Sequence, residues 1–138
     1  MTKRNIHGLW SMDFEDRILH SKLHGAANEE ACLVWREQLQ DKLLSSPEGD
    51  KTPWVSIIDT SGDWDGFTVE SWPVINDTVV WQAEHNCALI VVVITKELHN
   101  FTHQKYVSHH EIITAANSHE EAYQICIDKL AEVTSRNT

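Results

Sequence analysis

The sequence predicts an α/β fold, in which strands alternate with helices around a mostly parallel sheet. The run from Cys87 to Ile94 is apolar without alternation, which is typical of a strand covered on both faces. Several other segments carry apolar residues at helical spacing, and turn-forming residues separate them. The expected element order is β-β-α-β-α-β-α-β-α, with a four- or five-stranded mixed sheet, one antiparallel edge and flanking helices.

Composition indicates a globular protein. The chain has 138 residues, of which 41% are hydrophobic, and we expect residues 1–138 to form one domain with a substantial core. The formal net charge of −10 opposes binding to nucleic acids and to anionic membranes. The longest apolar run is far too short to insert into a membrane, and no apolar run follows the basic N-terminal residues, as a signal peptide would require.

The cysteines favour a reducing compartment. Cys32, Cys87 and Cys126 lie far apart, each among apolar neighbours, and none belongs to a CxxC motif. An odd count without such spacing argues against a disulfide framework or a zinc knuckle. We therefore expect buried, reduced thiols in a cytoplasmic protein.

The first elements are a hairpin and a helix. Residues 6–23 predict a β-hairpin that turns at Glu15 and Asp16, because apolar and polar residues alternate along its first strand. Residues 25–27 are small and predict a loop. Asn28 is a good N-cap for a helix over residues 29–44, which the Ser-Ser-Pro-Glu-Gly-Asp segment then ends.

The central stretch is a strand, a polar turn and a helix. Residues 54–59 supply β-branched apolar side chains, and residues 59–63 are turn formers. Thr68 is placed to cap a helix over residues 69–85, in which Pro73 is tolerable only near the first turn. A polar loop between a strand and a helix is where open α/β sheets place their sites, so we expect the functional edge here.

The C-terminal third continues the alternation. Residues 96–106 predict a short helix, and residues 111–116 predict the last strand. Ser118 and Glu121 form a capping-box pattern at the start of a final amphipathic helix.

These elements, together with IIDTSG at the end of the central strand and SHEEAYQICIDKL as the last helix, resemble a known family. They look like the SpoIIAA-like proteins of the STAS superfamily (sulfate transporter and anti-sigma-factor antagonist domains). The likeness covers nearly the whole chain in element order and is specific around Val55–Gly62 and His119–Ala122. It implies a small cytoplasmic module that is not an enzyme, needs no cofactor and binds other proteins. The superfamily also resembles a lipid-exchange fold, which implies a small apolar ligand as the alternative.

The phosphorylation signature of the family is broken in this sequence. Regulatory members carry a strand-ending D-L-S-G motif and then a D-S pair whose serine is phosphorylated. Residues 59–62 match the first part, but Phe67 and Thr68 stand where the D-S pair should be. If the loop is shifted to align Asp65, the phosphorylation site falls on Gly66, which has no hydroxyl. The resemblance therefore implies a member without the phosphoserine switch, although modification of Ser61 or Thr68 stays open.

Polar side chains gather in the loop after the central strand, and we expect a binding loop there. Its members are Asp59, Ser61, Asp63, Trp64, Asp65 and Thr68. They could bind a cation or accept a phosphoryl group, but the run lacks the later glutamate of a calcium loop. Turn formation and helix capping explain the same residues. Trp64 either tucks under the loop or projects as a contact anchor.

Histidines raise the question of a metal. His99 and His103 are spaced i, i+4 on the short helix, with His109 and His110 close behind. Such imidazoles can share a metal, but no complete ligand set accompanies them, so we expect no metal and a solvated helix face.

The helix over residues 69–85 carries more apolar surface than one face can bury. Val74 and Trp81 lie away from the stripe that includes Trp72. We expect these three residues to form a contact with a protein partner or in a homodimer. Packing of Trp81 under the loop after His85 is the alternative.

The sequence thus predicts an interaction or regulatory module without catalysis, because no GxSxG, GxGxxG or P-loop motif is present. A carrier or sensor of a small apolar ligand is the alternative. An enclosed apolar cavity would favour the ligand, whereas a closed core with an exposed tryptophan patch would favour protein contacts.

Overall fold

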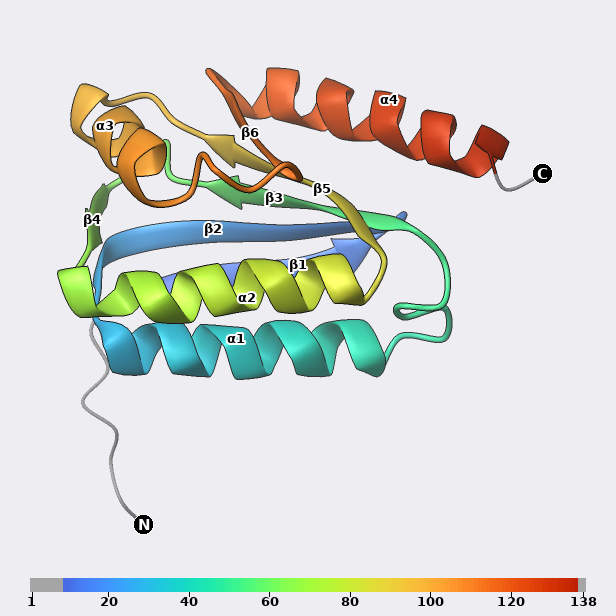
Figure 1. The fold of residues 1–138 in the computed structure, drawn as a ribbon, viewed down its shortest axis with the longest axis horizontal. Helices are drawn as coiled ribbons and strands as arrows, with labels where there is room; N and C mark the ends of the chain where they lie inside the picture. The colour runs from blue at the N-terminus through green and yellow to red at the C-terminus, as the bar shows by residue number, and fades with distance from the viewer. Residues whose placement is uncertain (1–8, 137–138) are drawn as a thin grey trace, which may run out of the picture.

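The computed structural model describes residues 9–136, within which six strands form one sheet with helices on both faces (Figure 1). The strands are β1 (Leu9–Glu15), β2 (Ile18–Ala27), β3 (Trp54–Asp59), β4 (Trp64–Phe67), β5 (Cys87–Val93) and β6 (Ile113–Ala116). The helices are α1 (Glu29–Leu44), α2 (Trp72–Glu84), α3 (Glu97–Tyr106) and α4 (His119–Arg136), with a short 3-10 helix, η1 (Val69–Ser71), before α2.

The sheet has the order β1-β2-β3-β5-β6, and β4 extends it beside β2. β1 pairs with β2 antiparallel, and every other pair of described strands is parallel. This confirms the predicted α/β fold with a mostly parallel sheet and one antiparallel edge. The prediction of four or five strands was one strand short, because β4 was not foreseen.

The hairpin turns one residue later than its sequence predicts. Asp16 and Arg17 both have positive φ, 53° and 67°, as in the two-residue turns whose twist matches that of the flanking strands. The predicted beginning of the hairpin at residues 6–8 lies outside the described residues. The loop predicted at residues 25–27 was wrong, because β2 bulges at Gly25 (φ 72°) and continues beside β4 to Ala27.

The missed strand β4 also changes how the next helix starts. After β4, the backbone N–H of Thr68 donates to the carbonyl oxygen of Ala27 at 3.0 Å, so the chain still follows β2. The residues that were expected to open an α-helix form η1 instead, and α2 begins at Trp72. Pro73 then lies in the first turn of α2, where its missing N–H breaks no helical hydrogen bond.

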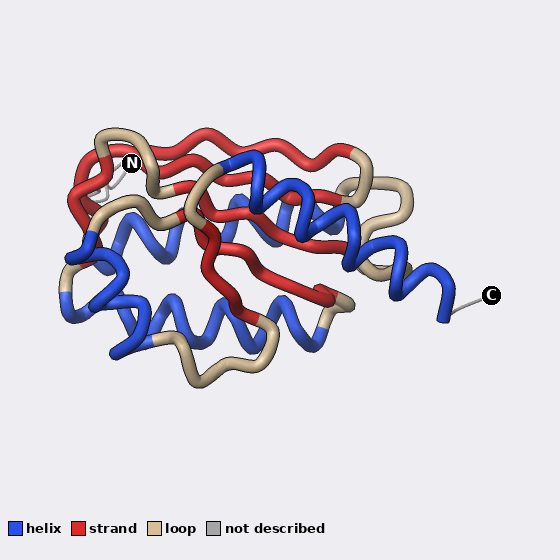
Figure 2. The backbone as a smooth tube through the Cα atoms, turned by 90° about the horizontal axis from the view of Figure 1, so that it is seen from above, coloured by secondary structure: helices blue, strands red, loops and turns tan. Residues whose placement is uncertain are grey.

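Helices cover both faces of the sheet, and one further helix lies at its end. α1 and α2 lie side by side on one face of the sheet, and α4 crosses the other face (Figures 1 and 2). α3 stands at the end of the sheet toward which the parallel strands run (Figure 1). That edge carries the carboxyl ends of the strands, where open α/β sheets bind their ligands.

Capping residues set two helix starts as predicted. The Asn28 side chain accepts a hydrogen bond from the backbone N–H of Ala31 at 3.0 Å, at the start of α1. The Ser118 hydroxyl accepts from the N–H of Glu121 at 3.1 Å, at the start of α4. The carboxylate of Glu121 in turn accepts from the N–H of Asn117, one residue earlier than in a standard capping box.

The two faces of the sheet have separate cores. Val55, Ile57, Val91 and Val93 point to the α4 side, where they pack with Cys126. On the other side, the buried residues come from the sheet, α1 and α2, and include Leu19, Leu39, Leu43, Trp54 and Ile90. The strand at residues 87–93 is thus covered on both faces, as its unbroken apolar run predicts.

Candidate functional site

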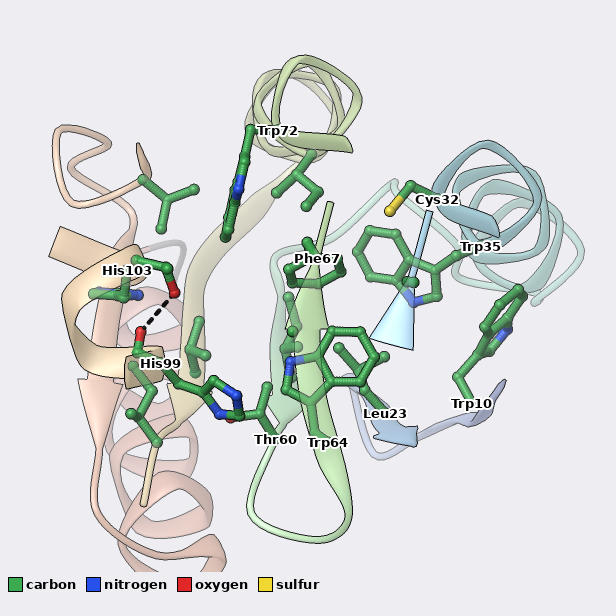
Figure 3. Close-up of a pocket in the computed structure, with 18 of the residues that line it drawn as sticks. Trp10, Leu23, Cys32, Trp35, Thr60, Trp64, Phe67, Trp72, His99 and His103 are labelled. Atoms are coloured by element: carbon green, nitrogen blue, oxygen red, sulfur yellow. Dashed lines mark hydrogen bonds between the residues drawn. The ribbon is translucent and has the colours of Figure 1, made fainter. Parts of the chain in front are cut away.

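A cavity lies between the sheet and the α1–α2 layer, at the end closed by α3 (Figure 3). Its volume is about 80 Å³. The lining is predominantly apolar and rich in aromatic rings, including Trp10, Leu23, Trp35, Trp64, Phe67 and Trp72. Because Thr60 and Ile94 follow the ends of β3 and β5 and also line it, the cavity sits at the carboxyl edge of the sheet.

Two of the tryptophans face the cavity with their N–H groups already bonded. The indole N–H of Trp10 donates to the Gln38 side-chain oxygen at 2.9 Å, and that of Trp35 donates to the Ser21 hydroxyl at 3.3 Å. With these polar atoms occupied, both rings offer mainly their apolar surface to the cavity.

A row of aromatic contacts braces one wall of the cavity. Trp64 meets Phe67 edge to face, with ring centroids 4.7 Å apart, and Phe67 meets Trp72 in the same way at 5.1 Å. Trp72 then stacks on Tyr106 at 4.6 Å with an interplanar angle of 7°. These contacts connect the strand β4 with the helices α2 and α3. The aromatic wall therefore holds these three elements together.

Two histidines of α3 add imidazole rings to the lining of the cavity. His99 and His103 are only 7% and 6% exposed, and both line the cavity. Figure 3 shows the His99 ring extending from α3 toward Thr60 and Trp64. Nδ1 of His99 has no hydrogen-bond partner among the described residues. Burial lowers the pKa of His103, which favours its neutral form.

The expectation of a solvated histidine face on this helix was therefore wrong. α3 turns its histidines inward and leaves Leu98 and Phe101 outside, 63% and 62% exposed. The reason is the register with the residues that follow, since His99, His103 and buried Val107 share one helical stripe and Val107 belongs to the core.

The four histidines do not converge on one point. His110 faces α2, where its Nε2 lies 2.6 Å from the Asn76 side-chain oxygen, and its ring packs against that of His109 at 4.1 Å. Among residues 9–136, no group of three or more His, Cys, Asp or Glu side chains is arranged to hold a metal ion.

The residues of the expected binding loop point in different directions. Asp59 is buried and accepts hydrogen bonds from the N–H of Ser61 at 2.8 Å and from its hydroxyl at 2.5 Å. Burial alone would raise the pKa of Asp59, but the hydrogen bonds from Ser61 and the positive charge of Lys22 lower it. This pair closes the end of β3 as an Asx turn.

The other residues of the expected binding loop lie in different surroundings from Asp59 and Ser61. Asp63 is exposed and its carboxylate lies 2.6 Å from Nδ1 of His24, and this hydrogen bond lowers the pKa of Asp63. Trp64 is 2% exposed, so of the two arrangements considered for it, the structure adopts the one inside the loop. Asp65 and Thr68 are exposed. The Thr68 hydroxyl lies 2.8 Å from that of Ser71 and makes no capping hydrogen bond to the backbone.

The three residues expected at an interface differ in how far they are buried. Trp72 and Val74 are both 8% exposed and pack in the core that α1 and α2 share. Trp81 is half-buried and stacks on His85, with ring centroids 4.0 Å apart, so part of its surface is covered within the chain. The second apolar face of α2 is thus largely covered by α1.

No family model matches the sequence, and no curated protein matches it at a significant level. Solved structures match it over most of its length. An anti-sigma factor antagonist from Mycobacterium paratuberculosis matches with a TM-score of 0.61 at 9% identity, covering 88% of this chain and 96% of that one. SpoIIAA in its unphosphorylated form matches with a TM-score of 0.59 at 10% identity, covering 85% and 96%.

The chain has the SpoIIAA-like fold. A third match, an uncharacterised protein from Shewanella loihica with that same fold, has a TM-score of 0.54 at 16% identity and covers 91% of this chain and 98% of that one. These likenesses confirm the resemblance drawn from the element order. At such low identities they establish the arrangement of strands and helices and carry no residue roles.

Within this SpoIIAA-like fold, the three thiols are free and buried, as predicted. Burial raises the pKa of Cys32 to about 11 and that of Cys126 to about 12, so both remain thiols at neutral pH. The helices within the described residues include none that is long and apolar enough to cross a membrane.

Sequence reasoning located the correct edge of the sheet but missed the cavity. The expected binding loop and the cavity share only Trp64, and the other lining residues come from nine segments, namely the six strands and α1, α2 and α3 with their adjoining residues. One signal was available for the histidines, because their i, i+4 spacing continues to Val107 and marks the inward face of α3.

Proposed function

We propose that this chain is a non-catalytic binding module of the SpoIIAA-like fold that takes a small apolar ligand, or the apolar end of a larger one, in the cavity beneath α3. The observation that carries the proposal is the aromatic-lined cavity at the carboxyl edge of the sheet. Protein interiors pack at crystal-like density and contain few voids larger than a water molecule. An apolar void of this size is therefore a feature to explain.

The volume limits the ligand. At about 80 Å³, the cavity lies between the roughly 30 Å³ share of one water and the roughly 150 Å³ of an engineered cavity that binds benzene. A short branched alkyl group is an occupant of suitable size. The lining favours such a group over water, because a buried water needs several polar partners.

Titration with 2-methylbutane, followed by the NMR signals of the indole N–H groups, tests this proposal. We expect saturable shifts for the tryptophans that line the cavity. Ala31→Leu adds bulk to the wall of the cavity at a residue 1% exposed, and it should abolish the shifts. Ala83→Leu is the matched control, because Ala83 is exposed on α2 and should leave binding unchanged. The absence of saturable shifts in the unaltered protein would contradict the proposal.

A second candidate function is contact with a protein partner, either foreign or a second copy of the chain. Val69, Leu98 and Phe101 are 68%, 63% and 62% exposed, and they lie on η1 and α3 at the cavity end of the molecule. These residues, more than the buried Trp72 and Val74, support an apolar contact surface. Free, buried cysteines support a reducing location such as the cytoplasm.

Sedimentation of the purified protein at low and high salt tests the homodimer. With a net charge of −10 on each chain, an apolar contact should strengthen as salt screens the repulsion. Phe101→Asp should then give a monomer, whereas Val80→Asp, at an exposed position of α2, serves as the control. A monomer under all conditions would remove the homodimer and leave a foreign partner.

A further inference from the structure

His99 is the polar group of the cavity whose bonding is incomplete. It is 7% exposed, and its Nδ1 has no hydrogen-bond partner among the described residues. The two threonine hydroxyls of the lining already use their protons. Thr60 Oγ1 donates to the carbonyl oxygen of Val93 at 2.5 Å, and Thr102 Oγ1 donates to that of His99 at 3.1 Å. Neither hydroxyl has a proton left for a ligand, whereas Nδ1 of His99 has no partner among the described residues.

An unpaired nitrogen at this depth is costly. Burying a polar atom without a partner costs more than a typical hydrogen bond gains, so native proteins leave few such atoms. A water molecule is a poor remedy, because a buried water needs two to four polar partners and the lining is predominantly apolar. A ligand with one polar atom suits the site better.

The lining also restricts the charge of the ligand. It contains no Lys, Arg, Asp or Glu side chain among the described residues. An ionised group would lose its hydration there without gaining a counter-ion. A neutral imidazole nitrogen either donates or accepts, depending on the tautomer, and a hydroxyl can serve both cases.

We propose that the cavity recognises a small uncharged alcohol, with its alkyl part among the indole rings and its hydroxyl bonded to Nδ1 of His99. This inference rests on the proposed function, since it names the class of ligand for the same cavity. Figure 3 shows the His99 ring reaching from α3 toward Thr60 and Trp64.

The test compares two probes of nearly equal shape, isobutanol and 2-methylbutane, in which a hydroxyl replaces a methyl group. Dissociation constants come from titrations followed by the indole N–H signals. Each probe is compared between protein variants, because leaving water favours the alkane over the alcohol whatever the site offers. His99→Leu should weaken binding of isobutanol about tenfold, as the loss of one net hydrogen bond implies, while binding of 2-methylbutane persists. His99→Asn, which keeps a polar atom near the place of Nδ1, should restore part of the affinity for isobutanol.

Two further measurements complete the test. His109→Leu is the matched control, because His109 is exposed, and it should leave both constants unchanged. His99→Leu should also raise the melting temperature of the free protein, because it removes an unpaired buried nitrogen.

The outcomes separate the two proposals. An affinity for 2-methylbutane in a protein that does not bind isobutanol would overturn recognition of the hydroxyl and leave the apolar cavity site intact. An affinity for isobutanol that is unchanged in His99→Leu would overturn the role of His99. Binding of neither probe would overturn the proposed function and this inference together.

Discussion

His103 makes the stability of the protein depend on pH. Because burial lowers its pKa, the unfolded chain binds a proton at a pH at which the folded chain does not. The free energy of unfolding should therefore fall as the pH drops below about 6.5, the usual histidine value, and continue to fall until the lowered pKa is reached. His110 adds to the same trend, since burial and the charge of His109 lower its pKa.

Replacing His103 should flatten this dependence. We expect His103→Gln to lose less stability than the unaltered protein between about pH 7.5 and pH 5.5, as measured by urea denaturation. The difference at pH 7.5, where both side chains are neutral, serves as the control for altered packing. An unchanged loss of stability on acidification would show that His103 does not titrate as its burial implies.

The Ser61 side chain closes the end of β3 by hydrogen bonding. Its hydroxyl and its N–H both donate to Asp59, a carboxylate that is itself 4% exposed. A phosphoryl group on this oxygen would remove one of those bonds and place negative charge beside a buried carboxylate. We therefore predict that Ser61 carries no stoichiometric phosphate in its own cells, as phosphoproteomics would determine.

A negative charge placed at Ser61 or at Thr68 tests the structural role of the Ser61 hydroxyl through its effect on stability. Ser61→Asp should lower the free energy of unfolding by about 1–2 kcal/mol, because a hydrogen bond is lost and like charges approach. Thr68→Asp should be nearly neutral, since Thr68 is exposed at the start of η1. Equal effects at both positions would argue against a structural role for the Ser61 hydroxyl.

Among the strands and helices, β4 is held in place more by the Trp64 side chain than by its hydrogen bonds to β2. It has four residues and lies at the end of β2, so its backbone contributes few ladder hydrogen bonds. Trp64, 2% exposed, fixes it to the cavity wall by packing in the core cluster that includes Leu23 and Trp72. Trp64→Ala should cost about 3–5 kcal/mol of stability.

Trp81→Ala is the matched comparison. Trp81 is half-buried and stacks on His85 within the same chain, so its loss should cost about 1–2 kcal/mol. Thermal or urea unfolding of the two variants would measure the difference. Similar losses for both would mean that Trp64 does not hold β4 in the way that its burial indicates.

Elements with local signals were predictable, and those that depend on distant partners were not. α1 has the predicted bounds, because Asn28 caps it and a Ser-Pro-Gly segment ends it. β4 has no alternation and contains Gly66 (φ 127°), so only its pairing with β2 makes it a strand. The inward histidines of α3 were misjudged because helix polarity alone does not show which face meets the core.

At the scale of the whole molecule, the cavity follows from how the layers end. α1 and α2 cover the sheet along its length, whereas α3 closes only the edge toward which the parallel strands run (Figure 1). The sequence predicted this edge from the order of strands and helices. It could not predict the cavity, because the volume depends on how side chains from all six strands and from α1, α2 and α3 meet.

A crystal structure of the protein grown or soaked with isobutanol tests the central claim most directly. We expect the alcohol inside the cavity beside Trp64, with its oxygen about 2.7–3.2 Å from Nδ1 of His99. A cavity that stays empty at a saturating concentration, or an ordered water on Nδ1 with the alcohol elsewhere, would contradict it.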